Sequence, residues 1–259
     1  MMKVGKMVKV TLVSLLLVGL VGYVAYAMLF LSKPDEDEKC MAVDLVVKQD
    51  SKSVFIDEKG IEEMLKSAHL YPKGMLMKDV DTEKIEETIR NNDFISKVEC
   101  YKTAAGTLRI NVEQRIPVIF VIPDGMDGYF VDAKGKIIPN RNNATNLVVA
   151  SGNIDEKFAS TKLAEFGQFL QTNVFWNNQI EQIYVQKDKK GKQKVELIPR
   201  VGNQVVYLGS MDDYQKKLHK LEIFYQKAVK TVGWDKYARV DLEYDNQIVC
   251  TKRDKKAHR

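Results

Sequence analysis

The sequence predicts an α+β fold that follows an N-terminal transmembrane helix. Three observations lead to this prediction. Residues 10–31 are mostly apolar and uncharged, residues 42–116 show the pattern of a β-α-α-β-β unit, and residues 117–252 hold many short strands and two longer amphipathic helices. We expect the first unit to be one sheet covered by two helices. The second should be a mixed α/β domain dominated by an antiparallel sheet.

The apolar segment at residues 10–31 is long enough to cross a bilayer, because as a helix it spans roughly 33 Å. Lys3, Lys6 and Lys9 precede it, and four acidic residues follow at positions 35–38. By the positive-inside rule, residues 1–9 form a cytoplasmic tail and the chain after residue 31 is exported. The segment therefore predicts a single-pass membrane protein with an exported C-terminal part.

A cleaved signal peptide is the competing interpretation of the same segment. Ala25-Tyr26-Ala27 fits an A-x-A cleavage site that follows a basic region and an apolar stretch. The apolar residues continue through Leu31, which makes the segment longer than most signal peptides and favours the anchor. A secreted protein cut after Ala27 stays open as an alternative.

The first domain is expected at residues 42–116, after a polar, acidic linker at residues 32–41. Its first strand is predicted by the alternation of Val43, Leu45 and Val47. Two helices follow, one with apolar residues at helical spacing from Ile61 and one that begins at the N-cap candidate Asp81. Two further strands, separated by a turn at 104–106, are predicted at residues 96–102 and 107–114.

The second domain is expected at residues 117–252. Its strands are predicted at 118–122, 129–131, 136–138, 180–186, 194–198, 204–208, 238–244 and 247–252. Its helices are predicted at 156–170 and from Asp212 or Asp213, as the N-cap, to about Val232. The strand at 118–122 is apolar on both faces, which is typical of a central strand, whereas the last strand is expected at an edge.

Charge argues against a nucleic-acid partner. The chain carries a net charge of +5, but three lysines of that excess precede the apolar segment and every acidic residue follows it. The exported part is therefore close to neutral, without the basic surface that nucleic-acid binding needs. The basic residues at 253–259 are expected to form a solvated tail.

The three cysteines, Cys40, Cys100 and Cys250, show no metal-binding or disulfide spacing. Cys100 and Cys250 alternate with apolar residues and are expected to behave as small, partly buried side chains in strands. Cys40 falls in the predicted linker. We expect three free thiols.

Catalytic and metal-binding patterns are not found in the sequence. His69, His219 and His258 are scattered, and no nucleophile, phosphate-binding or zinc motif occurs. The segment from Asp124 to Gly128 lacks two ligands of a calcium loop and is interpreted as a turn. Asp241 and Glu243 are interpreted as solvated residues of one strand face. The sequence therefore predicts a protein-binding module rather than an enzyme, with no cofactor and no small-molecule substrate.

Four segments resemble the FtsQ/DivIB family of bacterial division proteins. Residues 92–98 (NDFISKV) and 108–118 (LRINVEQRIPV) resemble the end of a POTRA domain and its junction with a β domain. Residues 129–138 (YFVDAKGKII) resemble the family's first hairpin, and residues 240–249 (VDLEYDNQIV) its late signature. The chain departs from the family pattern at Gln114, Ile119 and Glu243. The last of these, where Arg is common, changes the charge offered to a partner.

The resemblance implies a division scaffold in the inner membrane, with a POTRA domain at 42–116 and a β domain at 117–252 in the periplasm. It implies FtsB- and FtsL-like bitopic proteins as partners, and a place at the division septum. Another single-POTRA factor in export or envelope assembly is the alternative within the same fold.

An edge strand presents unpaired N–H and C=O groups to which an extended partner segment can add. The resemblance places partner binding at the end of the β domain, so the candidate site comprises Tyr244, Asn246, Gln247, Ile248, Val249, Cys250, Thr251 and Lys252. Tyr244 is the candidate aromatic anchor. Inward packing of Tyr244, Ile248 and Cys250 is the alternative, and it leaves the backbone site intact.

Overall fold

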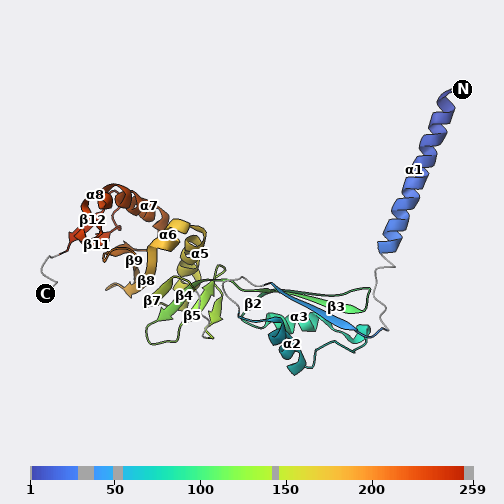
Figure 1. The fold of residues 1–259 in the computed structure, drawn as a ribbon, viewed down its shortest axis with the longest axis horizontal. Coiled ribbons are helices and arrows are strands. Elements are labelled where there is room, and N and C mark those ends of the chain that lie inside the picture. Colours follow the sequence, from blue (N-terminus) through green and yellow to red (C-terminus); the bar gives the residue numbers. More distant parts are fainter. Residues whose placement is uncertain (1, 29–37, 49–54, 142–145, 254–259) are drawn as a thin grey trace. The chain divides into compact units, whose positions relative to one another are not determined.

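The computed structural model describes residues 2–28, 38–48, 55–141 and 146–253 and divides into two compact units (Figure 1). One unit comprises Met1–Gln49 and Ile56–Gln114, and the other comprises Asp50–Phe55 and Arg115–Arg259. Each unit has its own hydrophobic core. The predicted α+β fold class is confirmed.

The N-terminal segment forms helix α1, Met2–Tyr26. Among the described residues, no helix is both long and apolar enough to cross a membrane. The transmembrane helix predicted at residues 10–31 is therefore not confirmed. Residues 29–37, which include the end of that segment and most of the predicted linker, lie outside the described residues.

The first unit has the predicted order β-α-α-β-β. Its strands form a three-stranded sheet in the order β1-β3-β2, in which β1 is parallel and β2 antiparallel to the central β3. Helices α2 and α3 lie on one face of this sheet (Figure 1). The elements are β1 Ala42–Lys48, α2 Glu58–Ser67, the 3-10 turn Met77–Asp79, α3 Thr82–Arg90, β2 Ile95–Lys102 and β3 Thr107–Gln114.

Local sequence explains these helices. The carboxylate of Asp57 accepts the N–H of Gly60 at 2.8 Å, and that of Asp81 accepts the N–H of Lys84 at 3.0 Å. Each side chain thereby satisfies a donor of the first turn. Apolar residues one turn apart, such as Ile85 and Ile89, are fully buried against the sheet.

Cys40 corrects the predicted linker. Its side chain is only 1% exposed and packs in the core of the first unit. Its N–H donates to Met75 O at 2.7 Å, and its carbonyl accepts the N–H of Gly74 at 2.8 Å. These backbone bonds fasten the segment before β1 to the α2–α3 connection, so the ordered unit begins before residue 42.

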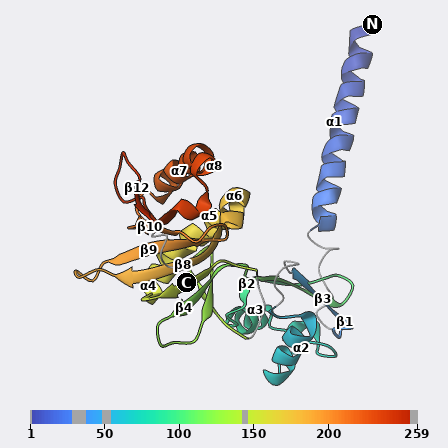
Figure 2. The ribbon, with the colours of Figure 1, turned by 60° about the vertical axis from the view of Figure 1, so that its left-hand side comes forward.

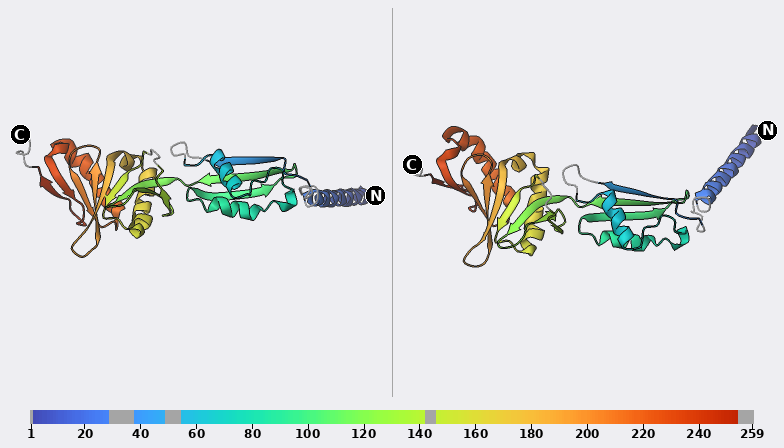
Figure 3. Two further views of the ribbon diagram at one scale, coloured as in Figure 1. Left: turned by 90° about the horizontal axis from the view of Figure 1, so that it is seen from below. Right: turned by 60° about the horizontal axis from the view of Figure 1, so that its bottom comes forward.

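The second unit is built on a nine-stranded mixed sheet in the order β12-β11-β10-β9-β8-β7-β4-β5-β6. The pairs β10–β11, β7–β8 and β4–β7 are parallel, and the other five are antiparallel. The hairpin of β8 and β9 projects beyond its neighbours (Figures 2 and 3). The strands are β4 Pro117–Pro123, β5 Tyr129–Asp132, β6 Ile137–Pro139, β7 Val149–Gly152, β8 Ile180–Lys187, β9 Gln193–Pro199, β10 Val205–Gly209, β11 Tyr237–Asp241 and β12 Val249–Lys252.

Two helical stretches and a short helix bury one face of this sheet. Phe166 and Leu170 of the first stretch and Leu218 and Leu221 of the second pack in one core with inward residues of the strands. The first stretch comprises α4 Glu156–Phe158, a π turn Ala159–Leu163 and α5 Ala164–Thr172. The second comprises α7 Tyr214–Phe224, a π turn Tyr225–Val229 and α8 Lys230–Val232, and α6 Val174–Gln179 lies between them in sequence.

The structure differs from the sequence predictions for this unit at two missed elements, one N-cap and two strand bounds. The sequence did not predict β7 or α6, because β7 has four residues and ends at a glycine, and α6 follows α5 without a loop. Asp213 occupies the N-cap position of α7 but has φ of 52° and makes no capping bond. The strand predicted at 238–244 ends at Asp241, and the one predicted at 247–252 begins at Val249.

Candidate functional site

Strand β12 lies at the end of the nine-stranded sheet and pairs only with β11 in the described chain. The two strands are antiparallel, with Val240 opposite Cys250 and Asp241 opposite Val249. The expected edge position of the last strand is therefore observed. Among the described residues of this unit, no strand pairs with the other side of β12.

Two backbone bonds fix the direction of the remaining polar groups of β12. The N–H of Leu242 donates to Tyr207 O of β10 at 2.9 Å, and the N–H of Arg253 donates to Lys236 O at 3.0 Å. Backbone groups of an antiparallel strand point alternately toward and away from the partner. The N–H and C=O groups of Cys250 and Lys252 therefore face away from β11, where an added strand would pair with them.

The side chains of the predicted site divide between two surroundings. Ile248 and Cys250 are half-buried and pack against the core, as the alternative interpretation held for them. Tyr244 is 52% exposed and Val249 is 44% exposed, so Tyr244 does not pack inward. The remaining members are also exposed: Asn246, Gln247, Thr251 and Lys252.

A lysine of α7 ends strand β11 early. The Lys220 ammonium donates to Leu242 O at 3.2 Å and also to Tyr244 O. The Glu243 N–H donates to the carboxylate of Asp241 at 2.9 Å. These bonds turn the chain out of the strand, so the prediction that Asp241 and Glu243 share a strand face is wrong.

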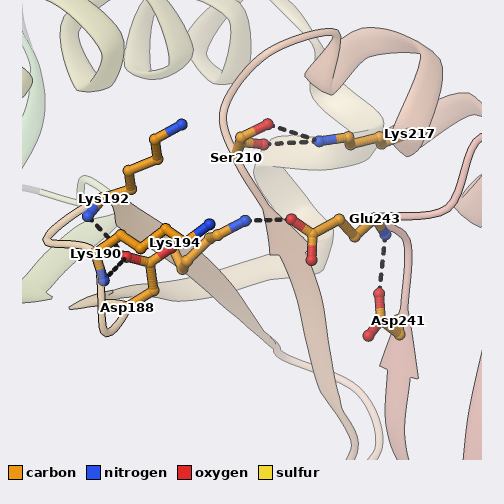
Figure 4. A network of polar contacts seen from close by, with 8 residues as sticks. All are labelled: Asp188, Lys190, Lys192, Lys194, Ser210, Lys217, Asp241 and Glu243. Atoms are coloured by element: carbon orange, nitrogen blue, oxygen red, sulfur yellow. Dashed lines mark hydrogen bonds and ion pairs between the residues drawn. The ribbon is translucent and has the colours of Figure 1, made fainter.

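Glu243 is held in place by a neighbouring strand. Its carboxylate forms an ion pair with Lys194 of β9 (Figure 4). Gly209 of β10 has φ of +73°, and a Cβ there would lie 2.9 Å from Glu243 Cδ. The sequence did not reveal Lys194, Gly209 or Lys220 as parts of the site, because each lies on an element far from residue 243 in sequence.

A second lysine of α7 lies beneath this turn. Lys217 is 9% exposed, and its ammonium donates to Ser210 O at 2.8 Å and to Ser210 Oγ at 3.3 Å (Figure 4). Burial removes water from this ammonium and lowers the pKa of Lys217. The ion pair with Glu243 raises the pKa of Lys194 instead. The two lysines therefore differ: Lys194 forms the ion pair with Glu243, and Lys217 binds Ser210.

Catalytic or metal-binding geometry is not found among residues 2–28, 38–48, 55–141 and 146–253. No three His, Cys, Asp or Glu side chains lie close enough there to hold a metal ion. His69 follows α2 with φ of 56°, His219 is exposed on α7, and His258 lies outside the described residues. All three cysteines are free thiols. What the site presents is backbone hydrogen-bonding groups beside exposed Tyr244 and Val249.

Comparison with known proteins covers both units. Residues 38–113 match the POTRA-like domain, and residues 116–251 match the family described as FtsQ/DivIB, C-terminal related. The chain is 23% identical to the cell division protein FtsQ of Rhodothermus marinus over 183 aligned residues. This aligned region covers 68% of this chain and 67% of that protein. The resemblance predicted from the sequence is confirmed: the chain belongs to the FtsQ/DivIB family of cell-division proteins.

Proposed function

We propose that this protein is a scaffold of the division machinery that binds an FtsB- or FtsL-like bitopic partner by strand addition to β12. The observation that carries the proposal is the edge position of β12, with outward backbone groups at Cys250 and Lys252. An extended partner segment would pair with those groups and extend the sheet. The protein acts by bringing partners together at the septum and performs no chemistry.

The turn before β12 supports the same proposal. Lys220 and Lys194 hold residues 242–244 in one conformation, while the Tyr244 side chain stays exposed. An aromatic side chain on a held backbone, beside an open strand edge, can contribute to binding with a smaller loss of backbone conformational entropy. Tyr244 is therefore the side-chain anchor of the site, and β12 supplies the backbone pairing.

Residues 10–31 attach the protein to the inner membrane in this proposal, with residues 1–9 in the cytoplasm and the two units outside it. The support is the uncharged sequence of the segment, with lysines before it and acidic residues after it. Alkaline carbonate extraction of cell membranes tests the attachment. The full chain should stay in the pellet and a Leu16→Lys, Val18→Lys variant should be released; a full chain found in the supernatant would contradict it.

The partner site is tested by co-purification of small single-pass proteins with the tagged full-length chain. Lys252→Pro removes an N–H that faces away from β11, so the sheet keeps its own bonds while an added strand loses one. Partner affinity should fall about tenfold, the effect of one lost backbone hydrogen bond and a disturbed strand. Lys252→Ala is the matched control and should bind like the natural chain.

Truncation after Tyr244 gives the complementary result, since it removes the whole edge strand. Small single-pass coiled-coil proteins should no longer co-purify with the truncated chain. If the truncated chain and Lys252→Pro both bring them down as well as the natural chain does, β12 is not the site, although the scaffold role stands. If they fail to co-purify with the natural chain, the scaffold proposal itself is contradicted.

A further inference from the structure

An open cleft of about 730 Å³ lies on the second unit, far along the sheet from β12. It is found at the carboxyl ends of the parallel strands β4, β7 and β8, on the face opposite the helical layer. Ile122, Ser151 and Tyr184 are opposite one another in register and form its floor. The turn from Asp124 to Asp127 forms its rim.

The rim supplies two carboxylates, those of Asp124 and Asp127, that have no side-chain partner among the described residues. Asp124 and Asp127 are exposed, and neither makes an ion pair or side-chain hydrogen bond with a described residue. The turn is held by its backbone instead: the Asp124 N–H donates to Gly152 O at 2.9 Å, and the Met126 N–H to Pro123 O at 3.3 Å. Among the described residues, no lysine or arginine lines the cleft, although the chain as a whole carries a net charge of +5.

The floor supplies an aromatic surface. Gly152 has φ of +104°, and a Cβ there would lie 3.0 Å from Tyr184 Cε2 and 2.2 Å from Val185 O. Only glycine at position 152 therefore lets the Tyr184 ring lie there. Tyr184 is 40% exposed. Met126 and Ile122, which are 58% and 39% exposed, add apolar surface on either side.

We propose that this cleft docks an extended segment of a partner protein in which an arginine is flanked by apolar residues. The guanidinium would stack on the Tyr184 ring and pair with Asp124 and Asp127, because a planar cation suits both an aromatic face and carboxylates. The flanking apolar side chains would cover Ile122 and Met126. This second surface shares no residue with the β12 edge, so the proposal stands apart from the proposed function.

Fluorescence anisotropy with the full-length protein in detergent tests the proposal. The probe is a fluorescein-labelled peptide, Gly-Leu-Arg-Leu-Arg-Gly, and the matched probe has glutamine in place of both arginines. The arginine peptide should bind to the natural chain. The double variant Asp124→Asn, Asp127→Asn should weaken this binding about tenfold, and Tyr184→Leu should weaken it by less. Asp235→Asn removes an exposed carboxylate of the same unit outside the cleft and should leave binding unchanged.

Three results would overturn the proposal. Equal binding of the arginine and glutamine peptides would show that the carboxylates select nothing. Loss of binding in Asp235→Asn to the same extent as in the double variant would indicate a general charge effect. If micromolar calcium chloride displaces the peptide and the Tyr184→Leu variant binds the peptide as well as the natural chain, the cleft is assigned to a metal ion instead. A circular dichroism spectrum identical to that of the natural chain confirms that each variant is folded.

Discussion

At the scale of single residues, buried polar groups determine how the second unit begins. Asp132 is 5% exposed, and its carboxylate accepts Arg115 Nη1 at 2.9 Å, the Lys134 N–H at 2.9 Å and the Lys136 N–H at 2.8 Å. These bonds join the first residue after the POTRA-like unit to the β5–β6 turn. The sequence predicted the hairpin, but the role of Asp132 follows only from the fold.

Replacement of Asp132 by alanine should destabilise the second unit by about 3 kcal/mol, because it leaves a mostly buried guanidinium and two N–H groups without their acceptor. Asp132→Asn keeps one acceptor oxygen and should cost less. Both tryptophans, Trp176 and Trp234, belong to the second unit, so their fluorescence during urea unfolding reports on this unit. An unchanged midpoint in Asp132→Ala would contradict the assigned role.

Thiol reactivity provides a pH-dependent prediction. Burial, with a smaller effect of Glu86, raises the pKa of Cys100 from 9.0 to about 12, and burial also raises the pKa of Cys250. Only about 10⁻⁴ of Cys100 is thiolate at pH 8, so it should react slowly with a disulfide reagent and about tenfold faster for each pH unit up to 11. Rapid labelling of Cys100 at pH 8 without denaturant, located by mass spectrometry, would contradict this.

The same shift affects stability in a defined direction. Because the folded pKa of Cys100 lies above its unfolded value, the unfolded chain releases its proton first as the pH rises. The contribution to stability is complete below about pH 9 and is lost as the pH approaches 12. Cys100→Ala should therefore lose less stability than the natural chain between these pH values.

At the scale of elements, local signals predicted most of the fold. The helices from Asp57 and Asp81 carry their own caps and apolar stripes, and the strands of the first unit alternate clearly. Elements that depend on distant residues were not predictable. β7 is buried between two parallel strands, and the end of β11 at Asp241 depends on Lys220, which lies on α7.

The candidate site shows the same division. Its edge position was expected from the order of elements at the end of the chain, and the exposed Tyr244 agrees with an anchor role. The bounds of the strand came from the structure, which also decided that Ile248 and Cys250 pack inward while Tyr244 does not. No periodic pattern reveals a lysine that binds carbonyls more than twenty positions away.

Lys220→Met should lower partner affinity about fivefold. The substitution removes the two contacts to the carbonyls of Leu242 and Tyr244, so the backbone that carries the Tyr244 side chain is no longer held. The unfolding midpoint should change little, since the ammonium lies at the surface of the unit. Lys227→Met, an exposed lysine in the π turn that follows α7, is the matched control. Equal affinities for the two variants would show that the turn does not position the anchor.

At the scale of the whole molecule, the chain has two units with separate cores. The first matches a POTRA-like domain, and the second matches the FtsQ/DivIB C-terminal family and holds both proposed surfaces. Those surfaces lie at different strands of one sheet, β12 and the β4–β7–β8 group. The two proposed surfaces share no residue, so under both proposals two partners could bind at the same time.

The most direct test of strand addition is amide hydrogen exchange at single residues of β12, with and without the co-purified partner. Strand addition predicts that the amides of Cys250 and Lys252, which face away from β11, exchange at least about tenfold more slowly when the partner is bound. The Arg253 amide already donates to Lys236 and should change much less. Unchanged exchange at Cys250 and Lys252 in the saturated complex would contradict pairing along β12.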